Sequence, residues 1–356
     1  MNNETRKETQ VLPKDVRCVG ADDLTLSLFE NQYPVQPMGV SYNSYLILDE
    51  KIAVMDSVDA RAADEWLAKL AHELDGRRPD YLVISHMEPD HSGSILRLAE
   101  KYQEMKLVGN AKTFTMLRQF FGAKAPTDDR LLEVGEGETL PLGAHTLHFM
   151  LAPMVHWPEV MVAYEETEKI LFSADAFGRF GSLGRTANAP WAPQARRYYY
   201  NIVGKYGAQV QALLKKASAL EIKTVCPLHG PVLTGEALGE ALRLYDLWSR
   251  WQSESPDDIL LAHASIHGNT ARAAELLKQK LEAAGARVTL CDLTATEVSY
   301  AVANAFYCGK LVLACSTYDG GLFPPMEEFL SHLQAKGFRD RSVGLMENGS
   351  WAPRRG

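Results

Sequence analysis

The sequence predicts a two-domain protein of mixed α/β and α+β class. From Tyr45 onward, short apolar strands alternate with amphipathic segments, and after residue 258 the alternation becomes a regular series of strands and helices. The 356 residues amount to a little more than two domains of about 150 residues each. The polar, proline-containing stretch 253–258 is the expected linker. We therefore expect a disordered tail at 1–14, a first domain at 15–252 and a second domain at 259–356.

The first domain begins with a predicted hairpin and a helix. Tyr45–Leu48 and Ile52–Met55 are apolar runs on either side of a polar turn, and residues 63–74 carry one apolar stripe at helical spacing. A buried strand, Tyr81–Ile84, then runs into a polar segment. The later elements follow the same pattern: strand Leu107–Val108, helix Thr113–Phe121, strand Thr146–Leu151, hairpin Val160–Tyr164 with Ile170–Ser173, helix 207–219 and strand Ile222–Cys226.

The second domain is predicted to be a parallel sheet with helical connections. Each pair of parallel neighbouring strands needs a crossover to return the chain, and a helix is the usual crossover. The expected strands are 259–264, 287–291, 311–315 and 342–346, and the expected helices are 270–284, 298–306 and 326–335.

The composition excludes several classes of protein. With 37 Lys and Arg against 45 Asp and Glu, the net charge of −8 repels nucleic acid and anionic membranes. The five cysteines are scattered without a C-x-x-C pair, which argues against a disulfide framework, an iron–sulfur cluster or a zinc knuckle. No run of about 20 apolar residues predicts a membrane span, and the N-terminus lacks the apolar segment of a signal peptide. We expect a cytoplasmic protein.

The densest chemical signal is the stretch SHMEPDHSG at residues 85–93, directly after a buried strand. Within six positions it places four possible metal ligands, which are His86, Glu88, Asp90 and His91. This crowding of imidazole and carboxylate groups favours a two-metal site, because a single metal needs fewer protein ligands. The alternative is a solvated surface loop in which a carboxylate or a hydroxyl caps the following helix.

Three further strand ends carry candidate ligands. His156 in MVHWPE, Asp175 in FSADAFG and His229 in CPLHGP each follow an apolar strand, in a turn that holds glycine or proline. The chain thus offers four histidines and three carboxylates, and Asp175 can bridge two metals with its two oxygens. The remaining candidates are expected to be structural: His145 and His148 on opposite faces of one strand, His72 and His332 on helix surfaces, and Tyr198–Tyr200 in the core or on a helix.

The second domain carries a different pattern at its strand ends. The stretch SIHGNT at 265–270 opens a helix with hydroxyls and successive backbone N–H groups, an arrangement suited to a phosphate. It lacks the GxGxxG of dinucleotide sites and the lysine of a P-loop, which favours a mononucleotide. Such a loop can also simply cap a helix. Two later loops, at 316–321 and 347–353, are expected at the same carboxyl edge of the sheet.

Together these motifs resemble those of a known family. The pattern H-x-[EH]-x-D-H, followed by spaced His, Asp and His, is the motif set of the metallo-β-lactamase fold, in which the third position is generally His rather than Glu88. With EPDHSGS, HWPE, SADAFG, PLHGP, TYDGG and ENGSWAP, the chain is similar to the flavodiiron proteins from about residue 35 to residue 353. The resemblance implies a metallo-β-lactamase-like αββα sandwich followed by a flavodoxin-like, doubly wound parallel sheet.

The resemblance also implies cofactors, namely two non-haem irons and FMN. Glu88 is a hard oxygen donor and suits iron better than another imidazole would. One iron would be held by His86, Glu88 and His156, the other by Asp90, His91 and His229, with Asp175 bridging. FMN would be bound at its phosphate by Ser265, Ile266, His267, Gly268, Asn269 and Thr270, and at its ring by Ser316, Thr317, Tyr318, Asp319, Gly320, Asn348, Gly349, Ser350 and Trp351.

The implied function is an FMN-dependent diiron oxidoreductase that reduces dioxygen to water, nitric oxide to nitrous oxide, or both. Reduced FMN and two ferrous ions together supply the four electrons that dioxygen needs. The resemblance implies a separate electron donor, such as rubredoxin or a reduced deazaflavin, and a head-to-tail homodimer or a dimer of dimers.

Two other functions stay open on the sequence alone. One is a zinc-dependent hydrolase of the metallo-β-lactamase fold that acts on thioesters or phosphodiesters, and the other is a flavodoxin-like binding protein with a structural metal site. Glu88 and the phosphate loop favour the oxidoreductase. The chain ends after the fourth strand of the second domain, so we expect an incomplete flavodoxin-like sheet without its fifth strand and last helices, by roughly 40 residues.

Overall fold

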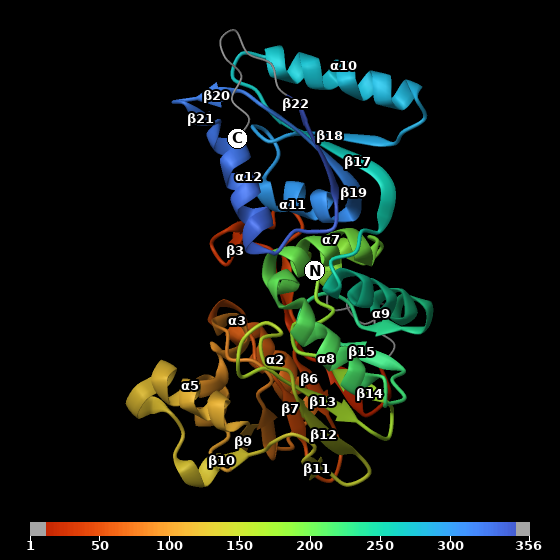
Figure 1. Cartoon of the computed structure of the whole chain (residues 1–356). Helices are drawn as coiled ribbons and strands as arrows, with labels where there is room; N and C mark the ends of the chain where they lie inside the picture. The colour runs from red at the N-terminus through yellow and green to blue at the C-terminus, as the bar shows by residue number, and fades with distance from the viewer. Residues whose placement is uncertain (1–11, 347–356) are drawn as a thin grey trace. The chain divides into compact units, whose positions relative to one another are not determined.

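A computed structural model describes residues 12–346 (Figure 1). The chain divides into two compact units. The first runs to Ala195 and includes Gln209–Arg243, and the second consists of Arg196–Ala208 and the chain from Leu244 onward. The divisions fall inside three helices: α7 (Trp191–Tyr198), α8 (Gly207–Ala217) and α9 (Gly235–Ser249).

The stretch expected as a linker, 253–258, has a different structure. Strand β17 (Ser255–Ala264) begins inside it, so no separate linker is present at this point among the described residues. Two of the polar residues that suggested a linker are aspartates near the start of this strand, and each forms an ion pair with a basic residue of another segment. The pairs are Asp257 with Lys310 at 3.2 Å and Asp258 with Arg287 at 2.5 Å.

The first unit is built from two mixed six-stranded sheets. In the first sheet, β7 to β10 run parallel and β1 and β6 are antiparallel to their neighbours. In the second sheet, all neighbours are antiparallel except β14 and β15. The first sheet comprises β1 (Val16–Cys18), β6 (Tyr45–Ile47), β7 (Ala53–Met55), β8 (Tyr81–Val83), β9 (Lys106–Gly109) and β10 (Leu131–Glu133). The second comprises β11 (Thr139–Pro141), β12 (Thr146–Leu151), β13 (Met161–Glu165), β14 (Ile170–Phe172), β15 (Thr224–Cys226) and β16 (Leu233–Thr234).

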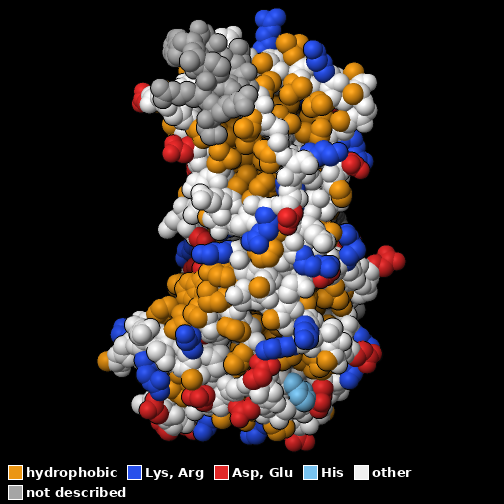
Figure 2. Space-filling view, viewed as in Figure 1, with side chains coloured by type: hydrophobic (Ala, Val, Ile, Leu, Met, Phe, Trp, Pro, Cys, Tyr) orange, Lys and Arg blue, Asp and Glu red, His pale blue; other side chains and the backbone are white. Residues whose placement is uncertain are grey.

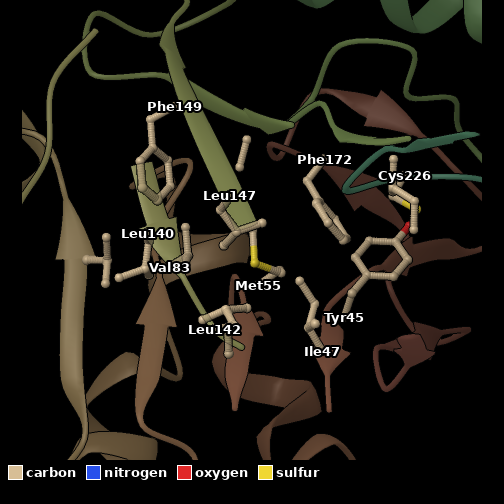
Figure 3. Packing of buried hydrophobic residues seen from close by; sticks show 14 of the residues in the cluster. Tyr45, Ile47, Met55, Val83, Leu140, Leu142, Leu147, Phe149, Phe172 and Cys226 are labelled. Atoms are coloured by element: carbon tan, nitrogen blue, oxygen red, sulfur yellow. The ribbon is translucent and has the colours of Figure 1, made fainter. Parts of the chain in front are cut away.

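The core of the first unit lies between these two sheets (Figure 3). Side chains at every second position of one sheet meet those of the other, because successive residues of a strand point to opposite faces. Tyr45, Met55 and Val83 come from the first sheet, and Leu147 and Phe149 come from the second. This packing confirms the predicted sandwich. Its helices are α2 (Ala63–Leu74), α3 (Pro89–Ser92), α4 (Ile95–Lys101), α5 (Ala111–Phe121), α6 (Leu183–Thr186) and the first parts of α7 and α9 with most of α8.

Short strands complete the first unit. β2 (Ala21–Asp23) pairs with β5 (Val40–Tyr42), and β3 (Leu28–Phe29) pairs with β4 (Tyr33–Pro34), both antiparallel. The turn between β3 and β4 holds Glu30 and Asn31 at positive φ, +51° and +53°. Two successive positive φ values are the geometry of a type I′ turn, which the Gln32 N–H closes by donating to the Phe29 carbonyl at 3.0 Å.

The second unit contains the predicted parallel sheet. Its order is β18-β17-β19-β22, and every neighbouring pair is parallel. Right-handed crossovers in both directions from β17 place helices on both faces, as in a doubly wound sheet. Figure 1 shows α10 on one side of the strands and α11 and α12 on the other. The bounds are β18 (Val288–Asp292), β19 (Cys308–Cys315), β22 (Ser342–Met346), α10 (Asn269–Ala283), α11 (Val298–Tyr307) and α12 (Pro324–Ala335), with a small hairpin of β20 (Thr317–Tyr318) and β21 (Gly321–Leu322).

The surface of the second unit is partly apolar. Figure 2 shows hydrophobic side chains gathered on its visible face. On β22, which is an edge of the described sheet, Val343 and Leu345 are 52% and 68% exposed. Over the described residues, every helix is too short or too polar to traverse a lipid bilayer.

Candidate metal centre

The ligand-rich stretch after β8 is held from below by a buried carboxylate. Asp56, at positive φ after β7, accepts hydrogen bonds from the backbone N–H of Ser85 at 2.7 Å and of His86 at 3.4 Å. Burial raises the pKa of Asp56, although the Ser85 hydrogen bonds and the charge of His91 oppose the shift. These bonds fix where the chain leaves the strand. The stretch is not the loop that the sequence predicted throughout, because Pro89 begins the short helix α3, and proline is well suited to a first helical position.

One group of candidate ligands gathers around the Glu88 carboxylate. His86 Nε2 lies 3.3 Å and His156 Nε2 lies 3.1 Å from Glu88 Oε2. His86 and His156 are nearly or fully buried, whereas the Glu88 side chain retains slight exposure. The family resemblance implies this grouping, and in the structure one ligand atom from each of these residues and from Asp175 lies within 4.8 Å of the others.

A second group gathers around the Asp90 carboxylate. Asp90 Oδ2 lies 3.3 Å from His229 Nε2 and 3.4 Å from His91 Nε2, and these two imidazole nitrogens are 3.1 Å apart. Asp90 and His91 are neighbours on α3, whereas His229 comes from the turn after β15. The packing of the two sheets therefore joins residues 138 positions apart in the chain.

Asp175 lies between the two groups and faces each with a different oxygen. Its Oδ2 is 3.0 Å from His156 Nε2 and 3.5 Å from His86 Nε2. Its Oδ1 is 3.2 Å from His91 Nε2 and 3.7 Å from His229 Nε2. A carboxylate placed in this way can bridge two cations. All seven candidate ligands named from the sequence are thus collected at one place.

The contacts among these groups shift the pKa values of several of them. Burial alone would lower the pKa of His156, but its hydrogen bonds to Asp175 and Glu88 raise it to about 9. Burial also lowers the pKa of His91, but the negative charges of Asp90 and Asp175 outweigh this effect and raise the pKa to about 8. Burial would raise the pKa of Asp175, yet the surrounding imidazoles hold it well below its ordinary value. The cluster therefore holds protons where a metal would bind.

The donor set fits two divalent cations. Both carboxyl oxygens of Asp90 and the Oδ1 atom of Asp175 are buried without a hydrogen-bond partner among the described residues, although each residue lies within 3.4 Å of an imidazole nitrogen. Buried acceptors that lack donors are costly unless a cation or a donor satisfies them. This mixture of imidazole and carboxylate donors suits iron, manganese or zinc. Each group also holds one hard carboxylate, which makes the site better suited to iron than a site made of imidazoles alone.

The ligand imidazoles are oriented by different partners, which the sequence analysis did not identify. His86 Nδ1 lies 2.7 Å from Glu159 Oε1, and His229 Nδ1 lies 2.7 Å from the backbone carbonyl oxygen of Ser41. Glu159 stands in the HWPE motif, where its spacing from His156 gave the only available signal. The Ser41 carbonyl carries no sequence signal, because any residue supplies that group.

Glu30 is a further acidic group that the sequence analysis missed. It lies at the tip of the β3–β4 hairpin, whose Phe29 ring packs edge-on against the His229 ring with centroids 5.3 Å apart. Desolvation of its carboxyl and the negative charge of Glu88 raise the pKa of Glu30 above its ordinary value. Because the residue is exposed, solvent screens part of this interaction.

The histidines and tyrosines expected to be structural lie in other surroundings. His145 is buried and pairs with buried Glu165 at 3.0 Å, whereas His148 pairs with Glu166 at the surface at 2.8 Å. Burial of the tyrosine hydroxyls raises the pKa of Tyr199 and Tyr200. His72 is exposed on α2, His332 is half-buried on α12, and Tyr198, Tyr199 and Tyr200 are all buried.

The candidate phosphate loop follows β17 in the second unit. Gly268, at φ +84°, precedes α10, and its N–H donates to Ser265 Oγ at 3.1 Å. The Ser316 hydroxyl lies 3.2 Å from Thr270 Oγ1 and 3.4 Å from the Ile266 nitrogen, so the two strand-end loops are adjacent. His267, Thr317, Tyr318, Asp319 and Gly320 are exposed or near the surface beside them, and Asn269 begins α10. Asn348, Gly349, Ser350 and Trp351 lie outside the described residues.

Comparison with known proteins points in one direction. The model of the family described as ODP family beta lactamase matches residues 40–230. The rubredoxin-oxygen oxidoreductase of Megalodesulfovibrio gigas is 28% identical over 348 residues, which cover 94% of this chain and 84% of that protein. An anaerobic nitric oxide reductase flavorubredoxin of Aliivibrio salmonicida is 27% identical over 350 residues, which cover 96% of this chain and 69% of that protein. The chain spans half the length of another relative, the diflavin flavoprotein A 1 of Synechocystis.

A solved structure agrees with these relatives. The crystal structure of the flavodiiron protein from Giardia intestinalis superimposes with a TM-score of 0.87 at 27% identity, over 94% of this chain and 82% of that one. The similarity therefore extends through both units of the described chain.

Proposed function

The chain belongs to the ODP family of beta lactamases and is a flavodiiron protein, and on this premise we propose that it is an FMN-dependent diiron oxidoreductase. It would reduce dioxygen to water, nitric oxide to nitrous oxide, or both. The observation that carries the proposal is the position of Asp175, whose two oxygens face two separate groups of ligands. A hydrolase of this fold would not need the phosphate loop of the second unit.

The geometry of the first unit supports the proposed ligand roles. We propose that His86, Glu88 and His156 hold one iron, that Asp90, His91 and His229 hold the other, and that Asp175 bridges them. When bound, the metals supply redox chemistry and a template for the diatomic substrate. The chain itself contributes a buried, rigid set of donors, because each ligand follows a strand or stands on α3.

The described loops of the second unit support the proposed flavin roles. Ser265 to Thr270 would bind the FMN phosphate with backbone N–H groups and hydroxyls at the start of α10. Ser316 to Gly320 would border the flavin ring, since ligands of parallel sheets bind at the carboxyl ends of the strands. The parts assigned to Asn348, Gly349, Ser350 and Trp351 are proposed from the sequence alone.

The electron balance links the two cofactors. Reduction of dioxygen to two waters consumes four electrons and four protons, and two ferrous ions with one reduced FMN hold four electrons. Reduction of two nitric oxide molecules to nitrous oxide and water consumes two electrons and two protons. A separate donor, rubredoxin or a reduced deazaflavin, would restore the electrons. We further propose a cytoplasmic location and a head-to-tail homodimer or dimer of dimers.

Metal and flavin analysis under anaerobic conditions tests the function. We expect two irons and one FMN per chain, with consumption of dioxygen or nitric oxide once the flavin is reduced. Parallel kinetics with both gases would give the preference. Two zinc ions without flavin, together with esterase or phosphodiesterase turnover, would replace the proposal with the hydrolase.

Complementation of two inactive variants tests the assembly. Asp175→Ala removes the bridging ligand, and Gly268→Arg blocks the phosphate loop, so each homodimer should lose turnover. In mixtures, a head-to-tail dimer restores one complete pair of iron and flavin sites. Recovery of about a quarter of wild-type activity after subunit exchange supports the arrangement, and no recovery despite verified exchange contradicts it.

A further inference from the structure

The two candidate metal positions differ in what stands behind their imidazoles. Behind His86 is the carboxylate of Glu159, with both side chains fully buried. Behind His229 is a neutral backbone carbonyl, that of Ser41. Within the described part of the chain, the buried Nδ1 of His91 has no hydrogen-bond partner. Of the Nδ1 atoms of His86, His91 and His229, that of His86 is the one that faces a carboxylate.

The hydrogen bond also fixes which nitrogen of His86 faces the metal. An ionised carboxylate can only accept hydrogen bonds, so His86 Nδ1 must carry the proton that it shares with Glu159. Nε2 is then the free donor atom, and it is the atom that lies near Glu88 and Asp175. The same Glu159 oxygen accepts the backbone N–H of Met87 at 2.8 Å, which ties the carboxylate to the ligand stretch itself.

A hydrogen bond to the backbone of Glu159 helps to fix its position. Its carbonyl oxygen accepts a hydrogen bond from Asn110 Nδ2 at 2.6 Å, and Asn110 is the N-terminal cap of α5. Glu159 is therefore anchored at its carboxylate by the Met87 N–H and at its backbone carbonyl by Asn110. A partner fixed in this way increases the basicity of the imidazole that it faces and stabilises the oxidised state of a metal bound there.

We propose that Glu159 is a positioning residue that presents His86 as an Nε2 donor and makes the metal position of His86, Glu88 and His156 the more electron-rich of the two. This inference rests on the proposed diiron function. An iron at that position would have the lower reduction potential, so in the half-reduced protein the ferric ion would be found there. The unequal pair would give the site a defined order of oxidation.

The test is Glu159→Gln in the iron-loaded, flavin-loaded protein. Glutamine keeps the size of the side chain and an oxygen that accepts from His86 and Met87, but it removes the charge. At a fixed solution potential, we expect the ratio of ferrous to ferric ion at the position of His86, Glu88 and His156 to rise about tenfold. This change corresponds to a rise of about 59 mV in the potential of a one-electron couple. The other position should shift much less. Redox titration followed by Mössbauer and electron paramagnetic resonance spectroscopy measures both.

Metal affinity gives a second readout that does not depend on turnover or on iron. Loss of an outer partner of a ligand typically weakens metal binding about 10- to 100-fold. Competition of Co²⁺ between the protein and a chelator should show one weakened site in Glu159→Gln and an intermediate effect in Glu159→Asp, which retains the charge on a shorter arm. Should Glu159→Gln fail to fold, Asn110→Ser, which keeps a helix cap but cannot reach the Glu159 carbonyl, should produce the same change at smaller size.

The chain supplies a matched control in the buried pair His145–Glu165. Glu165→Gln alters the same kind of contact, at 3.0 Å, outside the ligand set. It should lower the unfolding temperature without changing the potentials or the metal affinity. Equal behaviour of the two variants would reduce Glu159 to a structural role, and equal shifts at both metal positions would show that its charge does not act through His86. Either result overturns this inference while two bound irons and FMN would leave the proposed function intact.

Discussion

The metal centre and the flavin loops are assembled on opposite principles. The seven candidate ligands are mostly buried and are braced by contacts such as those of Asp56 and Glu159 beneath them. The two candidate FMN loops that the structure describes, 265–270 and 316–320, are short and largely exposed, and Ser316 links them through Thr270 and Ile266. A site that is built by packing keeps its geometry without its cofactor, whereas an exposed loop gains much of its order from the ligand. The predictions below separate these two kinds of site.

Removal of the bridging carboxylate should have the largest effect. Asp175→Ala takes away an oxygen from both groups of ligands, and we expect iron content below one per chain and activity reduced at least about 100-fold, the upper range for loss of metal-site support. FMN content should be unchanged, because the loops of the second unit do not include Asp175. Iron and flavin analysis of the purified variant measures both, and joint loss of the two cofactors would contradict independent sites.

Replacement of the oxygen donor should change the metal rather than abolish binding. Glu88→His restores the imidazole that is more usual at this position of the fold, and we expect the ratio of zinc to iron in the purified protein to rise about tenfold or more. Reductase activity should fall accordingly, since zinc has no redox chemistry. Metal analysis after growth in medium with both metals gives the ratio. Full reductase activity with unchanged iron would remove the reason for assigning iron to Glu88.

Strain in the phosphate loop should affect only the flavin. Gly268 lies at φ +84° with open space around it, so Gly268→Ala adds a methyl group without a clash but in a conformation that costs about 1–2 kcal/mol. We expect FMN to bind about tenfold more weakly with unchanged iron content. Gly285→Ala is the matched control, because Gly285 follows α10 at φ +88°, also without neighbours. It should lower stability alone, and equal loss of FMN in both variants would contradict the assignment of the loop.

The pH dependence of the metal-free protein should be the smallest effect. His91 and His156 have pKa values raised to about 8 and about 9, so their contribution to stability is complete below about pH 6.5 and is lost as the pH rises through these values. The unfolding temperature of the metal-free protein should therefore fall between about pH 6.5 and pH 9.5, while metal uptake tightens because fewer protons are displaced. Calorimetry with and without chelator checks this. A metal-free protein that becomes more stable over the same range would contradict it.

Much of the candidate metal centre was predictable because its chemistry is written in local motifs. His86 to His91 are close in sequence, and His156, Asp175 and His229 each follow an apolar strand, so residue type and strand ends sufficed to name them. The helical turn α3 was not predicted, since four residues are too few to show a period. The division of the chain also differed from the expectation, because units defined by packing can cut through helices that look continuous in sequence.

The sequence by itself determined the kinds of donor atom, the glutamate at position 88, and the alternation of strands and helices that specifies a sandwich and a parallel sheet. Only the tertiary structure decided which groups face one another. Glu159 meets His86 across 73 positions, and the Ser41 carbonyl meets His229 across 188. Such pairs arise when two sheets pack face to face, and the register of that packing depends on core side chains such as Tyr45 and Phe172 rather than on the residues that form the pair.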